Sequence, residues 1–468
     1  MMWRFERFGD SAALRDEYGQ TLSYNQLKAE GEALCAAAGG RCLTFNLCQN
    51  TIGSVVGYAG FIEGGIVPAL LNAAIDRELF DSLYQTYCPA YLWAPESFEW
   101  EGCQSVYGRF GYHLLKTPFG LQTELYPDLA LLLTTSGSTG SPKFVRQSYA
   151  NIRANTDSIV EYLRLDDSER PITTLPMNYT YGLSIINSHL DVGATILLTD
   201  KGIAQRDFWQ FFRAEGATSF GGVPYTYEML DRMRFLRMDL PTLRTMTQAG
   251  GKLLPELHQK FVEWCQKNGK RFVVMYGQCE ATARMAYLPW EKSLEKVGCM
   301  GIAIPGGRFE LIDVNGEVIT ENGVTGELRY YGANVTLGYA ESGADLKLGD
   351  ERGGVLETGD MAQRDADGYY RIVGRKKRFL KMYGNRVNLD ETERMLKAAF
   401  PDCECACAGR DDHMMIFSTV ESRLPEMRVF LSEKTGLNAS GFHTMALDAI
   451  PKNDSGKTLY RELEKYHV

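Results

Sequence analysis

The feature that most constrains the fold is a series of short apolar runs separated by stretches long enough to form helices. ALLLTT (130–135), GATILLT (193–199) and RFVVMYG (271–277) each have the length and the apolar content of a buried strand. Strands that alternate with helices form mostly parallel sheets covered by helices. The sequence therefore predicts an α/β fold, with a large N-terminal domain of this kind.

The residue pattern of the chain changes after about residue 300. The runs ELIDVNGEVIT, GELRYYG and DADGYYRIVG are short and strand-like, with Asn-Gly and Asp-Gly turns, which predicts a β-rich subdomain. The basic run GRKKRFLK (374–381) then marks a boundary. We predict a large domain at residues 1–376 and a small α+β domain at residues 377–468.

Two pairs of residues have the spacing of a capping box, in which a side chain at each end of the first helical turn satisfies a backbone amide. Ser23 and Gln26 predict a helix in the first forty residues, and Asp390 and Glu393 predict a second helix just after the basic run.

IGSVVGYAGFIEGGIVPALL (52–71) is long enough to span a bilayer and contains one charge, Glu63. Its five glycines, Pro68 and the central Glu63 argue against a membrane helix. We interpret this segment as a buried helix followed by a buried strand, and we expect no integral membrane segment.

Composition and charge exclude several classes of partner. Hydrophobic residues make up 44% of the chain and charged residues 23%, as in ordinary globular proteins. The formal net charge of -9 gives no general attraction to nucleic acid or anionic lipid, so an anionic ligand needs a local site. No nucleic-acid partner is expected.

The 11 cysteines are scattered, and the charged opening MMWRFERFGD is unlike a signal peptide. These features predict reduced thiols and a cytoplasmic location. CECAC (403–407) has the alternation of one strand face and no histidine at zinc-finger spacing, so we interpret its cysteines as buried strand residues rather than metal ligands.

TTSGSTGSPK (134–143) directly follows the first apolar run. Its amides, its hydroxyls and Lys143 are suited to phosphate oxygens. It is not a Walker A loop, because Lys143 follows Gly140 by three residues and no hydroxyl residue comes next. A later Gly-Lys-Thr has Pro451 where a P-loop requires glycine, which leaves Lys457 as a lysine on a glycine-containing loop.

Five motifs occur along the chain in a fixed order: TTSGSTGSPK, YGQCEAT (276–282), ETGD (357–360), GRKKRFLKMYGNRVN (374–388) and PKNDSGK (451–457). Together they resemble the core motifs of the ANL adenylate-forming superfamily, which comprises acyl- and aryl-CoA synthetases, adenylation domains and luciferases. The resemblance extends over essentially the whole chain, and it is to the compact acyl-CoA synthetase-like branch. It implies a ligase that uses ATP and Mg²⁺ to convert a small carboxylic acid into an acyl-adenylate, and then transfers the acyl group to a thiol such as that of CoA.

The resemblance also implies roles for individual residues. Glu280 would hold Mg²⁺, and Lys457 would bridge the substrate carboxylate and the α-phosphate. The nucleotide would be bound by a larger set: Thr135, Ser136, Gly137, Ser138, Thr139, Gly140 and Lys143 at the β- and γ-phosphates, Gly250, Gly251 and Tyr276 at the adenine, Gly277 and Cys279 in the YGQCE motif, and Asp360 and Arg375 at the ribose.

Superfamily members rotate the small domain between two half-reactions, so the resemblance implies that the C-terminal domain is mobile. Lys377 falls on the hinge position, and Gly384 would line the passage for the thiol. The acid pocket would be lined by Met177, Tyr179, Tyr181, Gly222 and Tyr225.

Three positions depart from the superfamily pattern. Cys279 replaces a threonine that contacts phosphate, and a thiol is a weaker donor. Phe144 stands where glycine is common. Tyr179 stands where many acyl-CoA synthetases have histidine and amino-acid adenylating domains have aspartate. Since it cannot pair with an α-ammonium, a fatty or aryl acid is favoured over an amino acid.

Two other functions stay open. The acyl group could pass to the phosphopantetheine arm of an acyl carrier protein, which we expect to be a separate partner because the chain ends soon after Lys457. Alternatively, the chain could be a catalytically silent nucleotide-binding homologue. Cys279 favours this slightly, and the set of Glu280, Asp360, Arg375 and Lys457 argues against it.

Overall fold

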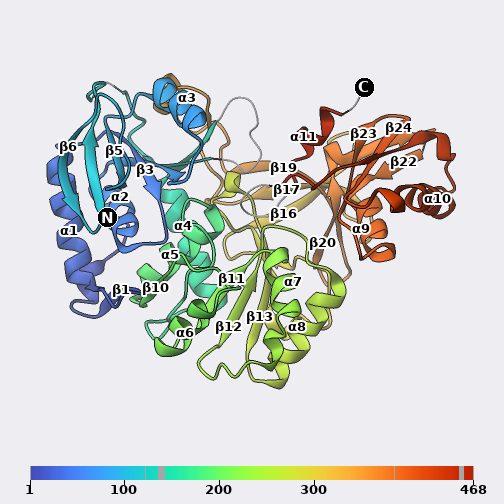
Figure 1. Ribbon diagram of the computed structural model, residues 1–468, viewed down its shortest axis with the longest axis horizontal. Coiled ribbons are helices and arrows are strands. Elements are labelled where there is room, and N and C mark those ends of the chain that lie inside the picture. Colours follow the sequence, from blue (N-terminus) through green and yellow to red (C-terminus); the bar gives the residue numbers. More distant parts are fainter. Residues whose placement is uncertain (1, 122, 135–142, 384, 453–457, 467–468) are drawn as a thin grey trace. The chain divides into compact units, whose positions relative to one another are not determined.

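The structure is a computed structural model that describes residues 2–121, 123–134, 143–383, 385–452 and 458–466. The chain divides into two compact units (Figure 1). Unit 1 comprises Met1–Arg308 and Tyr330–Leu356, and unit 2 comprises Phe309–Arg329 and Glu357–Val468. The domain boundary predicted between residues 376 and 377 falls within unit 2 and stays a prediction.

The largest sheet of unit 1 has eight strands in the order β18-β9-β8-β4-β3-β5-β7-β6. Its centre is parallel, since β3 pairs with β4 and β5, and β4 pairs with β8. The outer pairs on both sides are antiparallel. In chain order its strands are β3 (Leu43–Cys48), β4 (Val67–Asn72), β5 (Tyr91–Pro95), β6 (Gln104–Arg109), β7 (Tyr112–Lys116), β8 (Leu129–Thr134), β9 (Phe144–Ser148) and β18 (Gly338–Ala340).

Two further sheets complete unit 1. One consists of β11 (Ser219–Gly222), β12 (Thr245–Gln248), β13 (Arg271–Tyr276), β14 (Ala286–Tyr287) and β15 (Ile302–Ala303), and the other of β10 (Ile196–Leu198), β1 (Ala12–Asp16) and β2 (Thr21–Ser23). The three apolar runs that predicted strands are confirmed as β8, β10 and β13. Each has a parallel neighbour, and each lies in a different sheet.

Helices cover both faces of the eight-stranded sheet. Leu70, Leu131 and Leu133 pack in a core cluster with residues of α1, α2, α4 and α5, whereas Ala69 and Leu132 face α3. The α-helices of unit 1 are α1 (Tyr24–Ala38), α2 (Ile52–Glu63), α3 (Arg77–Tyr87), α4 (Tyr149–Leu163), α5 (Thr180–Val192), α6 (Arg206–Ala214), α7 (Pro224–Arg232) and α8 (Pro255–Lys267). Short 3-10 helices are η1 (Phe5–Arg7), η2 (Phe235–Arg237), η3 (Cys279–Ala281), η4 (Trp290–Lys292) and η5 (Gly343–Lys347).

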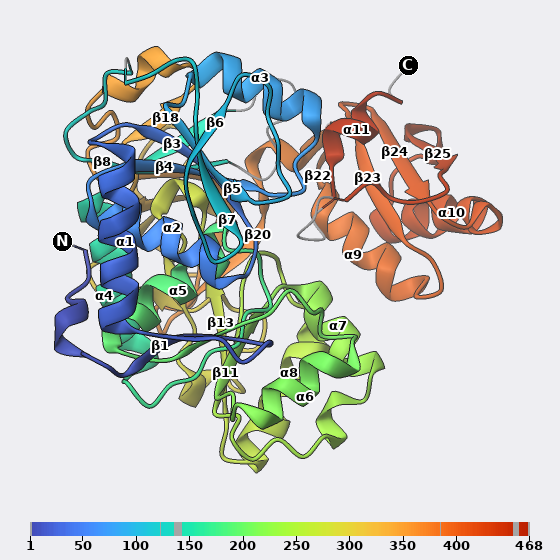
Figure 2. The same cartoon turned by 60° about the vertical axis from the view of Figure 1, so that its left-hand side comes forward.

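The sequence reading of the first seventy residues is confirmed. Ser23 and Gln26 form the capping box of α1. Segment 52–71 forms the buried helix α2 and enters the buried strand β4. Helices α1 and α2 lie side by side (Figure 2) and cross at two glycines, since a Cβ on Gly31 would be 2.8 Å from Cα of Gly60. In the described part of the chain, no helix is both long and apolar enough to cross a membrane.

Unit 2 contains three small sheets, as the β-rich runs predicted. The first consists of β16 (Arg308–Ile312), β17 (Gly326–Tyr331), β19 (Val355–Arg364) and β20 (Tyr370–Arg375), the second of β21 (Phe379–Met382) and β22 (Asn385–Asn388), and the third of β23 (Cys405–Arg410), β24 (His413–Ser418) and β25 (Phe442–Ala446). Its helices are η6 (Lys376–Arg378), α9 (Leu389–Ala399), η7 (Glu421–Arg423), α10 (Leu424–Thr435), η8 (Ala439–Gly441) and α11 (Tyr460–Glu464).

The second predicted capping box is wrong. Asn388 caps α9, because its side chain accepts hydrogen bonds from the amides of Asp390 and Glu391. Glu393 does not reach back to the cap, since its carboxylate is buried and binds Arg378 instead. The helix itself is present, and it begins one residue before Asp390.

The interpretation of the CECAC run as buried strand cysteines is confirmed for Cys405 and Cys407 and is wrong for Cys403, which is half-buried and precedes β23. Cys405 and Cys407 lie on one face of β23 in a core cluster, while Ala406 and Ala408 pack in another cluster on the opposite face. Burial raises the pKa of the Cys405 thiol to about 12, so it is protonated at neutral pH. Within the ranges described, no three His, Cys, Asp or Glu side chains are placed to hold a metal ion.

Candidate nucleotide-binding site

Strands β8 and β9 flank the predicted phosphate loop. Thr134 at the end of β8 pairs with Phe144 at the start of β9, and residues 135–142 connect them. The predicted loop residues Thr135, Ser136, Gly137, Ser138, Thr139 and Gly140 lie outside the described residues. Phe144 is fully buried, and its ring centroid lies 4.7 Å from that of Tyr87. This departure from the superfamily pattern therefore contributes to the core at the start of β9.

Lys143 is half-buried, and its ammonium lies over an aromatic ring. The Nζ atom is 3.7 Å from the ring centroid of Tyr339, which is on β18. Since β18 pairs with β9, the sheet itself brings Tyr339 beside Lys143. A cation over a tyrosine face contributes about 0.5–2 kcal/mol. The ring therefore restrains the lysine at the end of the loop.

Tyr339 also binds Glu280, a residue of η3. The Tyr339 hydroxyl donates a hydrogen bond to Oε1 of Glu280 at 2.7 Å. Burial, and then the Glu280 carboxylate, raise the pKa of Tyr339, so its hydroxyl stays protonated and remains a donor at neutral pH. One tyrosine thus positions both the lysine and the carboxylate that the sequence assigned to ATP and Mg²⁺.

Arg352 completes this group of side chains. Its Nη1 donates to the backbone carbonyl of Glu280 at 3.1 Å and to the hydroxyl of Thr336, and its guanidinium lies 4.7 Å from the Tyr339 ring centroid. We call Lys143, Glu280, Tyr339 and Arg352 the Lys143 cluster. It combines two cations and one carboxylate, an arrangement suited to a polyanion bound with a divalent cation.

The buried Arg146 of β9 holds the chain segment that carries Tyr339 and Arg352. Its side chain is 0% exposed, and Nε donates to the carbonyl of Tyr339 at 2.9 Å. Its other nitrogens donate to the carbonyls of Leu337, Leu348 and Gly349 and to the carboxylate of Glu351. One arginine thus satisfies several carbonyl groups of residues 337–349.

The predicted adenine-binding residues lie at the ends of two neighbouring parallel strands, β12 and β13. Gly250 has a φ of +82°, and a Cβ there would lie 2.6 Å from the Tyr179 hydroxyl, so only glycine fits. A Cβ on Gly251 would meet Pro224 at 3.0 Å, and one on Gly277 would meet the carbonyl of Ala283 at 1.6 Å. The Tyr276 hydroxyl, at the end of β13, accepts a hydrogen bond from Gln278 at 3.3 Å. The missing side chains at these three glycines thus let neighbouring protein groups pack close to the backbone.

In unit 2, the two predicted ribose-binding residues are cross-strand partners. Asp360 on β19 pairs with Arg375 on β20, and the Arg375 Nε atom lies 3.5 Å from Oδ1 of Asp360. The Asp360 side chain is 7% exposed and that of Arg375 is 65% exposed. The ion pair thus links a fixed carboxylate to a solvent-facing guanidinium.

Comparison with known proteins identifies the family. Residues 114–340 match the family model described as AMP-binding enzyme. The chain is 30% identical over 320 residues to an indoleacetate–CoA ligase of Aromatoleum aromaticum, which covers 67% of this chain and 60% of that relative. It is 30% identical over 274 residues to an oxalate–CoA ligase of Arabidopsis thaliana, which covers 58% of this chain and 52% of that relative. Residues 114–340 are therefore an AMP-binding enzyme domain, and the matches together with the five motifs support the ANL adenylate-forming superfamily.

Solved structures of one ANL enzyme share the fold. O-succinylbenzoate coenzyme A synthetase from Bacillus subtilis, in complex with AMP, superposes with a TM-score of 0.80 at 21% identity, covering 99% of this chain and 97% of that one. The complex of the same enzyme with ATP and magnesium ion superposes with a TM-score of 0.79 at 22% identity, covering 98% of both chains. The predicted α/β fold class is confirmed.

Two members of the Lys143 cluster were not predicted from the sequence. Tyr339 and Arg352 lie outside the five ANL motifs, and neither has a local pattern that distinguishes it from other aromatic or basic residues. They become recognisable only through the pairing of β18 with β9 and the contacts to Glu280. The signal is therefore tertiary.

The residues predicted to line the acid pocket lie in different surroundings. Met177 is 1% exposed in the core, where its sulfur accepts a hydrogen bond from Ser54. Tyr181 is buried, with its hydroxyl 2.8 Å from that of Thr247. Tyr179 is half-buried next to Gly250, and Gly222 packs closely against α7. Tyr225 is 48% exposed. Their role as pocket residues stays a prediction.

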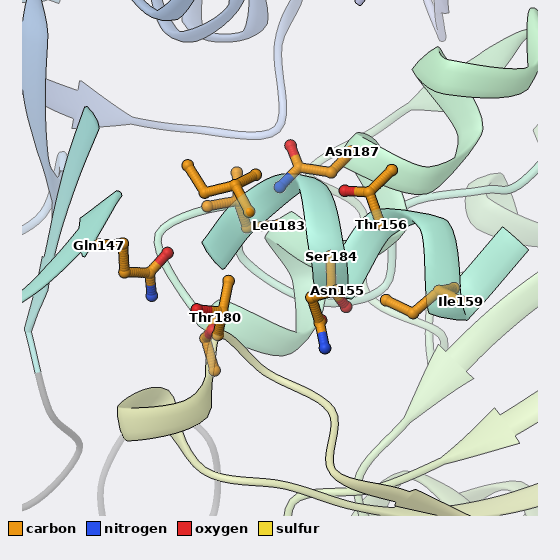
Figure 3. A pocket seen from close by; sticks show the side chains of 10 residues that line it. Gln147, Asn155, Thr156, Ile159, Thr180, Leu183, Ser184 and Asn187 are labelled. Atoms are coloured by element: carbon orange, nitrogen blue, oxygen red, sulfur yellow. The ribbon is translucent and has the colours of Figure 1, made fainter. Parts of the chain in front are cut away.

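A small cavity lies between β9, α4 and α5 (Figure 3). Its volume of about 10 Å³ is room for one water molecule, so it cannot hold a carboxylic acid. Polar side chains of Gln147, Asn155, Thr180 and Ser184 line much of it. None of the five predicted pocket residues lines this cavity.

Of four other predicted positions, the structure describes two. Lys377 lies in η6 between β20 and β21. Gly384 and Lys457 lie outside the described residues. Cys279 is the half-buried first residue of η3, adjacent to Glu280.

Proposed function

We propose that this ANL enzyme is an acid–thiol ligase. It converts a carboxylic acid and ATP into an acyl-adenylate and pyrophosphate, and then transfers the acyl group to the thiol of CoA, releasing AMP. The observation that carries this proposal is the Lys143 cluster, in which Tyr339 holds the loop lysine and the Glu280 carboxylate together. The coenzyme A ligases among its relatives support the same reaction class.

Glu280 fits a magnesium ion. Carboxylate oxygens are the protein ligands that Mg²⁺ prefers, and the hydrogen bond from Tyr339 fixes the orientation of this carboxylate. Bound Mg²⁺ would neutralise charge on the phosphates of ATP. Lys143, whose ammonium lies over the face of the same Tyr339 ring, would hold the β- and γ-phosphates as a point charge.

The first half-reaction needs charge stabilisation more than acid–base chemistry. The substrate carboxylate attacks the α-phosphorus in line, the bond to the bridging oxygen breaks, and pyrophosphate leaves with that electron pair. Lys457 would contact both the carboxylate and the α-phosphate and stabilise the charge that develops there. Asp360 and Arg375 would hold the ribose and so orient the α-phosphate.

The second half-reaction requires a thiol where Lys457 was. Thiolate attack at the acyl carbon forms the thioester and expels AMP, and no lysine is needed. We propose that residues 377–468 rotate about Lys377 between the two steps, so that Gly384 lines the thiol passage. One mobile domain would then serve both chemistries.

Tyr179 favours an uncharged substrate tail. It lies next to the Gly250 turn, and burial raises the pKa of its hydroxyl, so it presents a neutral group. A neutral phenol cannot neutralise an α-ammonium, whereas its ring suits an alkyl or aryl tail. We therefore propose a fatty or aryl acid as substrate.

A panel of fatty, aryl and amino acids tests the function directly. Each acid is incubated with ATP, Mg²⁺ and hydroxylamine, with and without CoA, and hydroxamate, pyrophosphate and AMP are measured. Hydroxamate formed in the absence of CoA shows that the acid is adenylated. A CoA thioester formed when CoA is present identifies CoA as the acceptor. A thioester formed only on phosphopantetheinylated acyl carrier protein would favour the carrier-protein ligase. Absence of pyrophosphate release with every acid would favour a silent homologue.

Replacing Tyr339 with phenylalanine separates its two contacts. The ring that holds Lys143 remains, but the hydrogen bond to Glu280 is lost, at a cost of about 1.5–3 kcal/mol for a bond to a charged group. We expect the Mg²⁺ concentration for half-maximal adenylation to rise by about tenfold or more. ATP binding in EDTA, measured by calorimetry, should stay within about twofold of wild type.

Tyr339→Leu is the matched comparison, because it removes the ring as well. This variant should weaken ATP binding in EDTA also, by the cation–π contribution of about 0.5–2 kcal/mol. If both variants shift only thermal stability and neither affinity changes, Tyr339 does not position the site.

A further inference from the structure

A buried ion-pair network lies in unit 2 around Arg378, the residue after the proposed hinge. The Arg378 side chain is 10% exposed. Its Nη2 donates to Oε1 of Glu393 at 2.6 Å, and its Nε donates to Oδ1 of Asp390 at 2.8 Å. Its Nη1 donates to the carbonyl of Cys407 on β23 at 2.7 Å. The guanidinium thus ties η6 to α9 and to the small sheet.

Glu393 extends this network to the C-terminal helix. Its Oε1 also accepts from the amide of Cys407 at 2.8 Å, and its Oε2 accepts from the hydroxyl of Tyr460 at 2.9 Å. The Tyr460 ring lies over the guanidinium, with the Arg378 carbon 3.7 Å from the ring centroid. Burial, and then the Glu393 charge, raise the pKa of Tyr460, so its hydroxyl remains a donor.

The chain positions of these residues connect the two ends of the proposed mechanism. Arg378 directly follows Lys377, and Tyr460 is the third residue after Lys457. The residues on either side of 453–457 bind each other: the Leu459 amide donates to the Pro451 carbonyl at 2.8 Å, and Lys452 forms an antiparallel bridge with Thr458. Tyr460 begins α11, which packs through Leu463 against Ala406 and Ala408 of β23.

We propose that Arg378, Glu393 and Tyr460 are positioning residues that lock the chain after Lys457 to the chain after Lys377, so that hinge rotation moves the catalytic lysine as one body with η6. The proposal rests on the proposed function, because it assigns the network a task in the first half-reaction. All three residues lie within 377–468, so the network would move with the small domain and would not be broken by rotation.

Directional bonds suit this task better than apolar packing. Apolar contacts are not directional, so α11 could shift slightly along β23 at little cost. Charged hydrogen bonds are shorter and directional, and a buried one is expensive to break because it leaves a charge unpaired. A shift of about 1 Å at the reacting group can cost about 10²-fold in rate. The network therefore determines how precisely Lys457 is positioned.

The test is Tyr460→Phe, with Tyr466→Phe as control. Tyr460→Phe keeps the ring over Arg378 and loses only the hydroxyl bond to Glu393, whereas the Tyr466 ring is 43% exposed. Three quantities are measured in each: acyl-adenylate formation from ATP, thioester formation from supplied acyl-adenylate and CoA, and amide hydrogen exchange of residues 458–466.

We expect Tyr460→Phe to lower adenylation about tenfold, the equivalent of one hydrogen bond to a charged group. Thioester formation should stay within about twofold of wild type, because that step does not use Lys457. Exchange at 458–466 should become faster. Tyr466→Phe should match wild type in all three measurements.

Two results would overturn the proposal: equal loss in both half-reactions, which means a general structural role, or unchanged adenylation with unchanged exchange. If the wild-type protein forms no acyl-adenylate from any acid, the proposed function fails instead. Hydrogen exchange then decides the mechanical part alone, since faster exchange supports the lock and unchanged exchange rejects it.

Discussion

Lys457→Ala is expected to lose acyl-adenylate formation by about 10²- to 10³-fold while retaining thioester formation from a supplied acyl-adenylate. The reason is that Lys457 would stabilise charge that develops only when the carboxylate attacks the α-phosphate. Pyrophosphate release in a single turnover measures the first step, and CoA thioester formed from synthetic acyl-adenylate measures the second.

Lys377→Pro is the complementary variant. A proline at the hinge fixes φ and removes an amide, so rotation between the two steps should be restricted. We expect normal pyrophosphate release in the first turnover and slow thioester formation, the reverse of the Lys457→Ala result. If each variant slowed both steps equally, two proposals would be contradicted. The domain would not rotate between two states, and Lys457 would not act in adenylation alone.

Arg146→Met is expected to be the most destabilising of these substitutions. Methionine fills a similar volume but leaves the carbonyls of Leu337, Tyr339, Leu348 and Gly349 without their donor. The cost should be about 3 kcal/mol or more, mostly from these buried carbonyls. The ion pair contributes little, because the Glu351 side chain is 54% exposed. We expect the apparent melting temperature to fall by about 5 °C or more, measured by calorimetry.

Arg109→Met provides the control for a surface arginine. Arg109 is 55% exposed and pairs with Glu30 at 3.0 Å, so its loss should change the melting temperature little. Arg146→Met should in addition raise the ATP KM, because Arg146 holds the carbonyl of Tyr339 beside Lys143. If Arg146→Met lowers the melting temperature no more than Arg109→Met does, the stability of the segment 337–349 does not depend on Arg146.

The two halves of the Lys143 cluster differ in how they could be found. Lys143 lies in a loop whose composition suits phosphate oxygens, and Glu280 lies in a motif that resembles one of the superfamily. Tyr339 and Arg352 are about 60 and 70 residues beyond Glu280 in the chain and have no such local signature. The contact depends on a three-residue strand, β18, which pairs with the edge of a sheet built mainly from the first 150 residues.

Glu393 also shows that local sequence spacing does not reveal tertiary contacts, because its predicted role in a capping box was wrong. Its spacing from Asp390 matched a capping box, and the helix was correctly expected. The carboxylate instead pairs with the buried guanidinium of Arg378, a charge-assisted hydrogen bond, and Asn388 caps the helix in its place. Local spacing could not reveal Arg378 as a competing donor.

The order of apolar runs and turn residues by itself determined the α/β class, the strands β8, β10 and β13, and the helix–strand reading of residues 52–71. These features depend on periodicity and composition within a few residues, which the sequence contains directly. The five ordered motifs added the resemblance to adenylate-forming enzymes. Tertiary structure decided that the three strands belong to three sheets, that Tyr339 joins Lys143 to Glu280, and that Arg378, Glu393 and Tyr460 meet. Such contacts form because strand pairing and the burial of charged groups are satisfied between residues far apart in the chain, and these energies exceed local preference.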